Sequence, residues 1–175
     1  MKEERISEHV SHPFGPIYDK SSRVIILGSM PSPKSREVGF YYGHPQNRFW
    51  RVLSSLWDEP VPATNEEREA LLHRHGIALW DVIGECEISG ASDSSIKNEK
   101  ANDIAYLARK IEAMAVFMTG KTAYKLYEKY CAASVGLPYF ALPSTSAANA
   151  AASLDMLAES YRAILKYTDL QYKQP

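Results

Sequence analysis

The segment from Gly28 to Trp50 concentrates residue types that bind ligands and take part in reactions. It starts where the apolar run Val24–Leu27 ends, and it opens with glycine, serine and proline. Three aromatic residues, a histidine and an asparagine then follow between positions 40 and 47. In α/β proteins, a buried strand that leads into such a loop and then into a helix often builds a ligand site. We therefore expect the chemistry of this protein in this loop.

Asn47 lies just before a predicted amphipathic helix, and its amide has two interpretations. Asn is a favoured N-cap because its side-chain oxygen accepts a free amide of the first helical turn. Held at the mouth of a pocket, the same amide would instead orient a water molecule or polarise a leaving group. His44 is a candidate acid or phosphate contact, although a loop histidine is more often structural. The residue types leave these alternatives open.

The three consecutive aromatic residues Phe40, Tyr41 and Tyr42 have two possible roles. Aromatic side chains usually fill the core beneath a loop. Three neighbours in a row cannot all point inward, however, so at least one is expected to be exposed or to line a cavity. An aromatic ring in a cavity provides a flat surface for stacking on a nucleobase.

The turn from Pro143 to Asn149 precedes the last predicted helix and carries the hydroxyls of Ser144, Thr145 and Ser146. Any of them would serve as a helix cap. Small hydroxylic residues at a helix N-terminus also form a good phosphate site, because free amides and the helix dipole favour an anion there. A DNA backbone phosphate would fit this turn.

Other polar segments are less informative. The stretch 89–98 is expected to be mainly a solvated connector, with the option of specificity contacts near the strand ends. Residues 119–122 lack the spacing of a phosphate-binding loop. The sequence contains no H-E-x-x-H, C-x-x-C or G-x-S-x-G motif and no carboxylate cluster, so we expect no metal, no cofactor and no serine-hydrolase chemistry.

The elements that must position these residues alternate between strands and helices. Compact apolar runs predict four strands at 24–27, 77–82, 115–118 and 139–142. Helices are predicted at 49–57, 66–75, 103–111, 122–130 and 147–167. This order predicts an α/β fold, a three-layer α/β/α sandwich with a mostly parallel four-stranded central sheet. Ligands bind such sheets at the carboxyl ends of the strands.

The bulk composition describes an ordinary globular protein. The 175 residues suffice for a single domain spanning residues 1–175, in which residues 1–22 form an irregular N-terminal wrap. The net charge of -1 neither indicates nor excludes nucleic-acid binding, because a local basic face suffices. Cys86 and Cys131 are expected to be ordinary reduced thiols. No apolar segment has the length of a membrane span, and we expect a cytoplasmic protein.

The motifs resemble the uracil-DNA glycosylase superfamily and, within it, the hypoxanthine-DNA glycosylase (DNA-deoxyinosine glycosylase) family. The shared pieces are Gly-Ser-Met-Pro at 28–31, Gly-His-Pro-Gln-Asn-Arg-Phe-Trp at 43–50, Leu-Trp-Asp-Val at 79–82, Asp-Ser-Ser-Ile at 93–96 and Leu-Pro-Ser-Thr-Ser at 142–146. They occur in the family's order between residues 24 and 149. The resemblance implies a parallel four-stranded sheet between helices and a monomeric enzyme of DNA base excision, without metal or cofactor. Its partner would be DNA that contains deaminated bases.

The resemblance also implies roles for single residues. Many branches of the superfamily have a catalytic Asp or Asn where this chain has Met30, and the hypoxanthine family resembles this chain in lacking it. Catalysis is then implied for Asn47, which would orient water and stabilise the developing sugar cation. Tyr42 would stack on the flipped base. The remaining implied contacts are Gly28, Ser29, Met30, Phe40 and Asp81 to the base, and His44, Ser144, Thr145 and Ser146 to phosphates and the gap in the DNA helix.

Three functions remain possible at this point. The first is hydrolysis of the N-glycosidic bond of a flipped hypoxanthine (deoxyinosine) base. The second is the same reaction on uracil or on mismatched thymine. The third is a non-catalytic module that binds DNA lesions, in which Met30 marks lost chemistry.

Overall fold

The central sheet has four parallel strands in the order β3-β2-β6-β7. The computed structural model describes residues 6–90 and 92–169. The strands are β2 (Val24–Gly28), β3 (Ile77–Asp81), β6 (Ala115–Thr119) and β7 (Tyr139–Leu142). All four coincide with the predicted strands, because each is a compact apolar run; β2, β3 and β6 are largely buried, whereas the edge strand β7 has Phe140 and Ala141 exposed. The predicted parallel sheet is confirmed.

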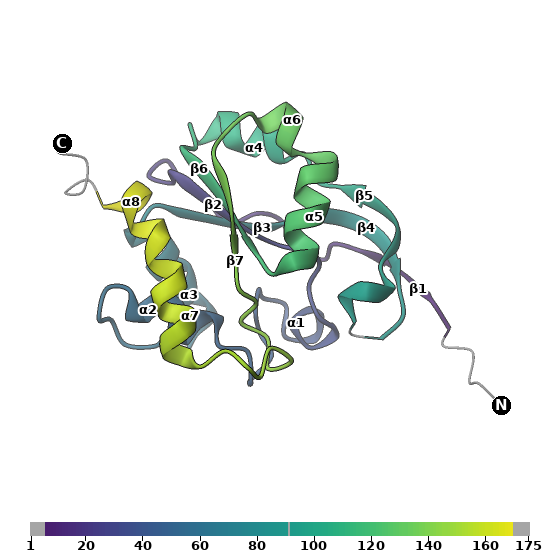
Figure 1. Ribbon diagram of the computed structural model, residues 1–175, viewed down its shortest axis with the longest axis horizontal. Coiled ribbons are helices and arrows are strands. Elements are labelled where there is room, and N and C mark those ends of the chain that lie inside the picture. The colour runs from purple at the N-terminus through teal and green to yellow at the C-terminus, as the bar shows by residue number, and fades with distance from the viewer. Residues whose placement is uncertain (1–5, 91, 170–175) are drawn as a thin grey trace.

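Helices cover both faces of this sheet (Figure 1). Side chains of β2 alternate between the faces, so that Val24 and Ile26 pack in one core cluster and Ile25 and Leu27 in the other. On the first face lie α2 (Phe49–Ser55), α3 (Asn65–Arg74), α7 (Leu154–Tyr161), the 3-10 helix η2 (Arg162–Ile164) and α8 (Leu165–Thr168). On the second face lie α4 (Ile104–Lys110), α5 (Lys121–Tyr130) and α6 (Ala132–Val135). The three-layer α/β/α architecture is confirmed.

A second sheet, which the sequence did not predict, lies beside the first. It is antiparallel, with the order β1-β4-β5. Its strands are β1 (Glu8–Ser11), β4 (Ile83–Ile88) and β5 (Lys97–Ala101). The predicted irregular wrap of residues 1–22 is therefore corrected for residues 8–11, which pair with β4; residues 1–5 lie outside the described part of the chain. The strand was missed because only Val10 of β1 is buried, and backbone pairing rather than an apolar pattern defines it.

Several helices differ from the sequence-based expectation, and the short helix α6 is among those that were not predicted. The last helix begins at Leu154 rather than at 147, because Ser153 caps it by accepting the backbone N–H of Met156. The residues before Leu154, including the Pro143–Asn149 segment, form turns and irregular structure instead of a helix. The short helix α1 (Pro33–Val38) was not predicted; Ser32 caps it, and Pro33 occupies its first turn.

Two further observations concern the chain as a whole. Both cysteines, Cys86 and Cys131, are free and buried. Burial raises the pKa of the Cys131 thiol to about 11, so this thiol stays protonated at neutral pH. Among the described residues, no helix combines the length and the apolar character needed to cross a membrane.

Candidate active site

A cavity of about 330 Å³ lies at the carboxyl ends of the parallel strands. Its volume falls within the range of small-molecule sites, about 300–1,000 Å³. The sequence-predicted residues that line it are Gly28, Ser29, Met30, Tyr42, Asn47, Asp81, Ser144, Thr145 and Ser146. The fold therefore brings together all of the predicted site residues except Phe40 and His44.

The floor of the cavity is formed where β2 and β3 end. Gly28 and Asp81 are register partners on these strands. A Cβ atom at position 28 would lie 2.5 Å from Asp81 Oδ1 and 3.2 Å from the hydroxyl of Tyr42, so only glycine leaves room for both. The Nε2 atom of His12 lies 2.7 Å from Asp81 Oδ2, and each of these side chains is 5% exposed. A buried carboxylate with an imidazole partner thus underlies the cavity.

Tyr42 forms an aromatic wall of the cavity. Its ring stacks on Phe49 with centroids 3.9 Å apart and an interplanar angle of 12°. Its hydroxyl lies 2.9 Å from Thr119 Oγ1, which fixes the second end of the ring. The backbone φ of Tyr42 is 51°, in the left-handed region that non-glycine residues seldom adopt. Because Phe49 covers one face of the ring, only the other face is available to a flat ligand.

Asn47 has a fixed orientation. Its Oδ1 accepts the backbone N–H of Phe49 at 2.9 Å and the hydroxyl of Thr145 at 2.8 Å. A backbone N–H is always a donor, so the oxygen of the amide must occupy this position. The capping interpretation is therefore correct in part, since Phe49 is the first residue of α2. The Nδ2 group is the end of the amide that is left for a ligand in the cavity.

Arg48 holds the turn after β7 in place, a role that was not predicted from the sequence. The guanidinium of Arg48 donates to the backbone carbonyls of Ser146 and Asn149 at 3.0 Å and also to that of Ala152. The backbone N–H of Arg48 donates to Thr145 O at 3.0 Å. The start of α2 and the turn at 145–152 therefore form one rigid unit, and this unit places Thr145 against Asn47.

Phe40 and His44 lie outside the cavity lining. The ring of Phe40 packs against Tyr41 and Trp50, with centroids 6.3 and 5.9 Å away. Phe40 therefore fills space beneath the loop, the usual fate of an aromatic side chain. His44 is exposed, and its Nδ1 accepts the backbone N–H of Gln46 at 3.1 Å. It lies on the surface close to Asn47, where a large ligand such as DNA can reach it.

Asp93 is a further polar residue of the cavity, and it comes from the segment expected to be a connector. It begins the 3-10 helix η1 (Asp93–Ser95), and its Oδ2 accepts the hydroxyl of Ser29 at 2.7 Å. Burial raises the pKa of this carboxyl, and the negative charge of Asp81 raises it further. The cavity therefore contains two carboxyl groups, one from each of two loops.

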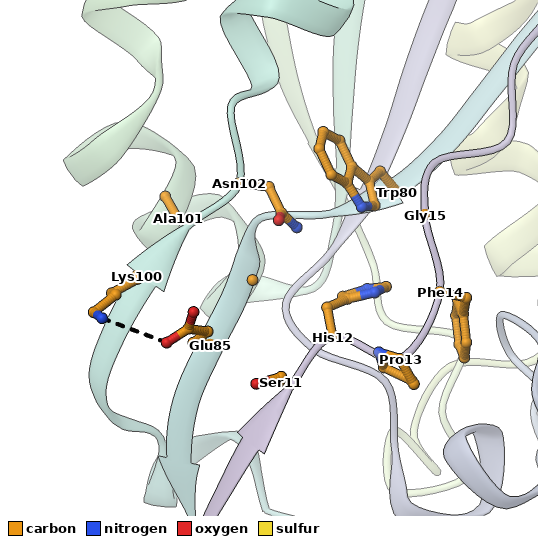
Figure 2. Close-up of a pocket in the computed structure, with 11 residues that line it drawn as sticks. Ser11, His12, Pro13, Phe14, Gly15, Trp80, Glu85, Lys100, Ala101 and Asn102 are labelled. Carbon is orange, nitrogen blue, oxygen red and sulfur yellow. Dashed lines mark hydrogen bonds and ion pairs between the residues drawn. The ribbon is translucent and has the colours of Figure 1, made fainter.

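A second, more open cleft of about 580 Å³ lies on the far side of His12 (Figure 2). Trp80, Asn102 and the ion pair between Lys100 and Glu85 border it. It contains none of the motif residues that line the smaller cavity. The candidate active site is therefore the cavity at the strand ends, although the open cleft is larger. Within residues 6–90 and 92–169, no group of three or more His, Cys, Asp or Glu side chains is arranged to hold a metal ion.

Comparisons with known proteins identify the family and the fold of this chain. A family model of the uracil DNA glycosylase superfamily matches residues 16–167. A hypoxanthine DNA glycosylase of Methanosarcina acetivorans is 31% identical over 137 residues, which cover 78% of this chain and 86% of that protein. A hypoxanthine DNA glycosylase of Methanosarcina barkeri is 39% identical over 95 residues, 54% of this chain; the match spans only 60% of that relative's length. The solution NMR structure of a candidate uracil DNA glycosylase from M. acetivorans superposes with a TM-score of 0.74 at 29% identity, covering 86% of this chain and 96% of the other.

Proposed function

Because the chain belongs to the uracil DNA glycosylase superfamily, we propose that it hydrolyses the N-glycosidic bond of a deaminated base, hypoxanthine, in DNA. The enzyme would flip the deoxyinosine nucleotide out of the duplex and into the cavity at the strand ends. It would act as a monomer, without a metal or cofactor. The observation that carries the proposal is the fixed amide of Asn47, which lies beside an aromatic wall in a cavity of suitable volume.

The reaction makes three demands on such a site. The departing base leaves an oxocarbenium-like sugar, as in other glycoside hydrolyses. The protein must hold the base, stabilise the charges that develop, and place a water molecule close to C1′. No metal is needed in principle, because pre-oriented polar groups can perform all three tasks.

The open face of Tyr42 is suited to hold the base. Its other face rests on Phe49, and its hydroxyl is anchored to Thr119. The ring is therefore fixed before a base arrives, and stacking requires no rearrangement of the side chain. Stacking of a base on an aromatic residue contributes roughly 1–3 kcal/mol.

Asn47 is suited to hold the water. With Oδ1 occupied by Phe49 and Thr145, the Nδ2–H group donates to one lone pair of the water oxygen. The other lone pair is then free to attack the sugar carbon. In the complete reaction, the water supplies the new hydroxyl group at C1′, and its proton ends on the departing base. An amide is a weak base, so Asn47 orients the nucleophile rather than deprotonating it.

The DNA backbone would contact the turn after β7. Arg48 draws the carbonyls of Ser146, Asn149 and Ala152 inward. Ser144 and Ser146 line the cavity, and their hydroxyls would contact a phosphate beside the flipped nucleotide. His44 is exposed on the neighbouring loop and would contribute a further phosphate contact.

The test is single-turnover cleavage of duplexes that contain inosine, uracil or only normal bases. Asn47→Ala should slow inosine cleavage by ~100-fold or more, equivalent to about 2.7 kcal/mol. Asn47→Asp keeps the oxygen that accepts from Phe49 and Thr145 but removes the Nδ2 donor, so it should be slowed comparably while the fold is retained. Asn65→Ala, at the start of α3 and away from the cavity, is the matched control.

The outcomes separate the three functions. Loss of inosine cleavage in both Asn47 variants, with Asn65→Ala unaffected, supports the proposal. Full activity of Asn47→Asp would refute the role of the Nδ2 donor. Cleavage of uracil alone would reassign the substrate, and binding of inosine-containing DNA without any cleavage by the folded wild type would indicate a lesion-binding module.

A further inference from the structure

We propose that Asp81 and Asp93 form an acidic wall that recognises the ring N–H group created when an amino base is deaminated. This inference rests on the proposed function and deepens it by naming the feature of the substrate that the site reads. The two carboxyl groups reach the cavity from different loops, one at the end of β3 and one from η1. Each has one oxygen engaged by a protein partner and one oxygen left for the base.

The carboxylate of Asp81 is held from behind. Its Oδ2 pairs with His12 Nε2 at 2.7 Å, on the side away from the cavity. Its Oδ1 faces the Cα atom of Gly28 at the cavity floor and has no hydrogen-bond partner among the described residues. A group that enters the cavity and donates a hydrogen would therefore find an acceptor already oriented.

The carboxyl of Asp93 is held in a similar way on the opposite loop. Its Oδ2 accepts the hydroxyl of Ser29 at 2.7 Å. The loop itself is fixed by Ser95, whose hydroxyl donates to Ser92 O at 2.7 Å and accepts the backbone N–H of Ser89 at 3.0 Å. Its Oδ1 has no hydrogen-bond partner within the part of the chain that the structure describes. The wall therefore presents two free acceptor oxygens and no fixed donor of its own.

An acceptor wall distinguishes a deaminated base from its parent because deamination changes one ring nitrogen from an acceptor into a donor. Adenine carries a bare lone pair at N1, whereas hypoxanthine carries N1–H beside a carbonyl group. The same exchange of an acceptor for a donor occurs when cytosine becomes uracil. A carboxylate oxygen opposite this position binds the donor and repels the lone pair. Sites built to match a donor in this way reject mismatched analogues by much more than a shape filter does.

The acidic wall therefore explains how the site spares adenine and cytosine, the amino bases from which hypoxanthine and uracil arise. Adenine would fit the cavity as well as hypoxanthine, because the two purines have nearly the same size and both stack on Tyr42. Shape alone would not separate them. The acidic wall separates them by hydrogen-bond polarity, because it binds a base with a ring N–H next to a carbonyl and repels one with a bare ring nitrogen.

Asp93→Asn is the sharpest test, because Asp93 lies on a loop outside the hydrophobic core. The asparagine amide has the same shape but presents either its oxygen or its NH2 group to the base, so it can pair with inosine or with adenine. We expect the ratio of inosine to adenine cleavage, measured in single turnover, to fall by ~10-fold or more. Glu66→Gln, an exposed residue on α3, removes the same charge far from the cavity and should leave the ratio unchanged.

The cleavage rates of Asp93→Asn either support or overturn the acidic wall. A variant that releases adenine measurably while still cleaving inosine supports the acidic wall. An unchanged ratio, or adenine release that stays undetectable while inosine cleavage persists, overturns it. Failure of the wild type to cleave inosine would instead refute the proposed function. Asp81→Asn provides a second measurement at the other carboxyl group of the wall, with its unfolding temperature recorded because it also disturbs the buried pair with His12.

Discussion

Replacing Arg48 with methionine should loosen the turn at 145–152 while the central sheet stays folded. The guanidinium donates to three carbonyls of this turn, those of Ser146, Asn149 and Ala152. Its Nε also lies 3.4 Å from Thr145 O. Methionine keeps much of the length and the apolar stem but removes every one of these donors. The four carbonyl groups would then be hydrogen-bonded only by water, or the turn would move away from the start of α2.

The magnitude follows from the number and kind of these bonds. A hydrogen bond to a charged group contributes about 1.5–3 kcal/mol when it is well formed. Arg48 is only partly buried, so water replaces some of the lost partners. We therefore expect a loss of about 3 kcal/mol in the free energy of unfolding. For a chain of this size that corresponds to a fall of roughly 6–12 °C in the unfolding temperature.

Thermal unfolding followed by circular dichroism, together with single-turnover cleavage, measures both consequences. Inosine cleavage should fall by ~10-fold or more, because Thr145 no longer holds the amide of Asn47 in place. Arg51→Met on the same helix is the control, since Arg51 is exposed and makes none of these contacts. An unfolding temperature and a cleavage rate that match those of Arg51→Met would refute the reasoning.

Two further predictions concern the floor and the acidic wall. Gly28→Ala places a Cβ atom 2.5 Å from Asp81 Oδ1, so it should abolish most inosine cleavage at a stability cost of about 1–3 kcal/mol; Gly15→Ala, where nothing lies within 4 Å of the added atom, should change neither quantity. The pKa of Asp93 is raised by burial and by Asp81, so its carboxyl becomes a protonated donor at a higher pH than an ordinary aspartate does. The ratio of inosine to adenine cleavage should therefore decline as the solution is acidified, and the decline should be weaker in Asp93→Asn. A ratio that stays constant down to the pH of unfolding would contradict this role.

The central sheet and most helices were predictable because their residues carry the signal themselves. The four parallel strands are compact apolar runs, three of them largely buried, and an amphipathic stripe marked α2. The loops at the carboxyl ends of the strands followed from the topology, so Gly28, Asn47 and Asp81 were placed in one site from the sequence. Tyr42 was chosen over Phe40 for stacking by the family resemblance alone, and only Tyr42 lines the cavity.

The second sheet, and the side chains that reach the site from its ends and loops, were not predictable in the same way. β5 is almost fully exposed, and its residues show no apolar alternation. The segment Ile83–Ile88 buries Ile83, Cys86 and Ile88, and the short alternation from Cys86 to Ile88 was the one local signal of this strand. His12 and Asp93 reach the site through pairings with Asp81 and Ser29, which lie 69 and 64 positions away in the chain. Nothing local to either residue reveals such a partner.

The pairing of β1 with β4 also bears on when the site comes into being during synthesis. Ser11 is the register partner of Glu85, and His12 donates its backbone N–H to Gly84 O. The imidazole therefore reaches Asp81 only after β4 has been made and the first strand has returned to dock on it. A nascent chain that has completed β2 and β3 alone still has an unpaired carboxylate at the end of β3. Contacts between such distant segments form late and slowly, so the floor of the cavity is completed only after β1 has paired with β4.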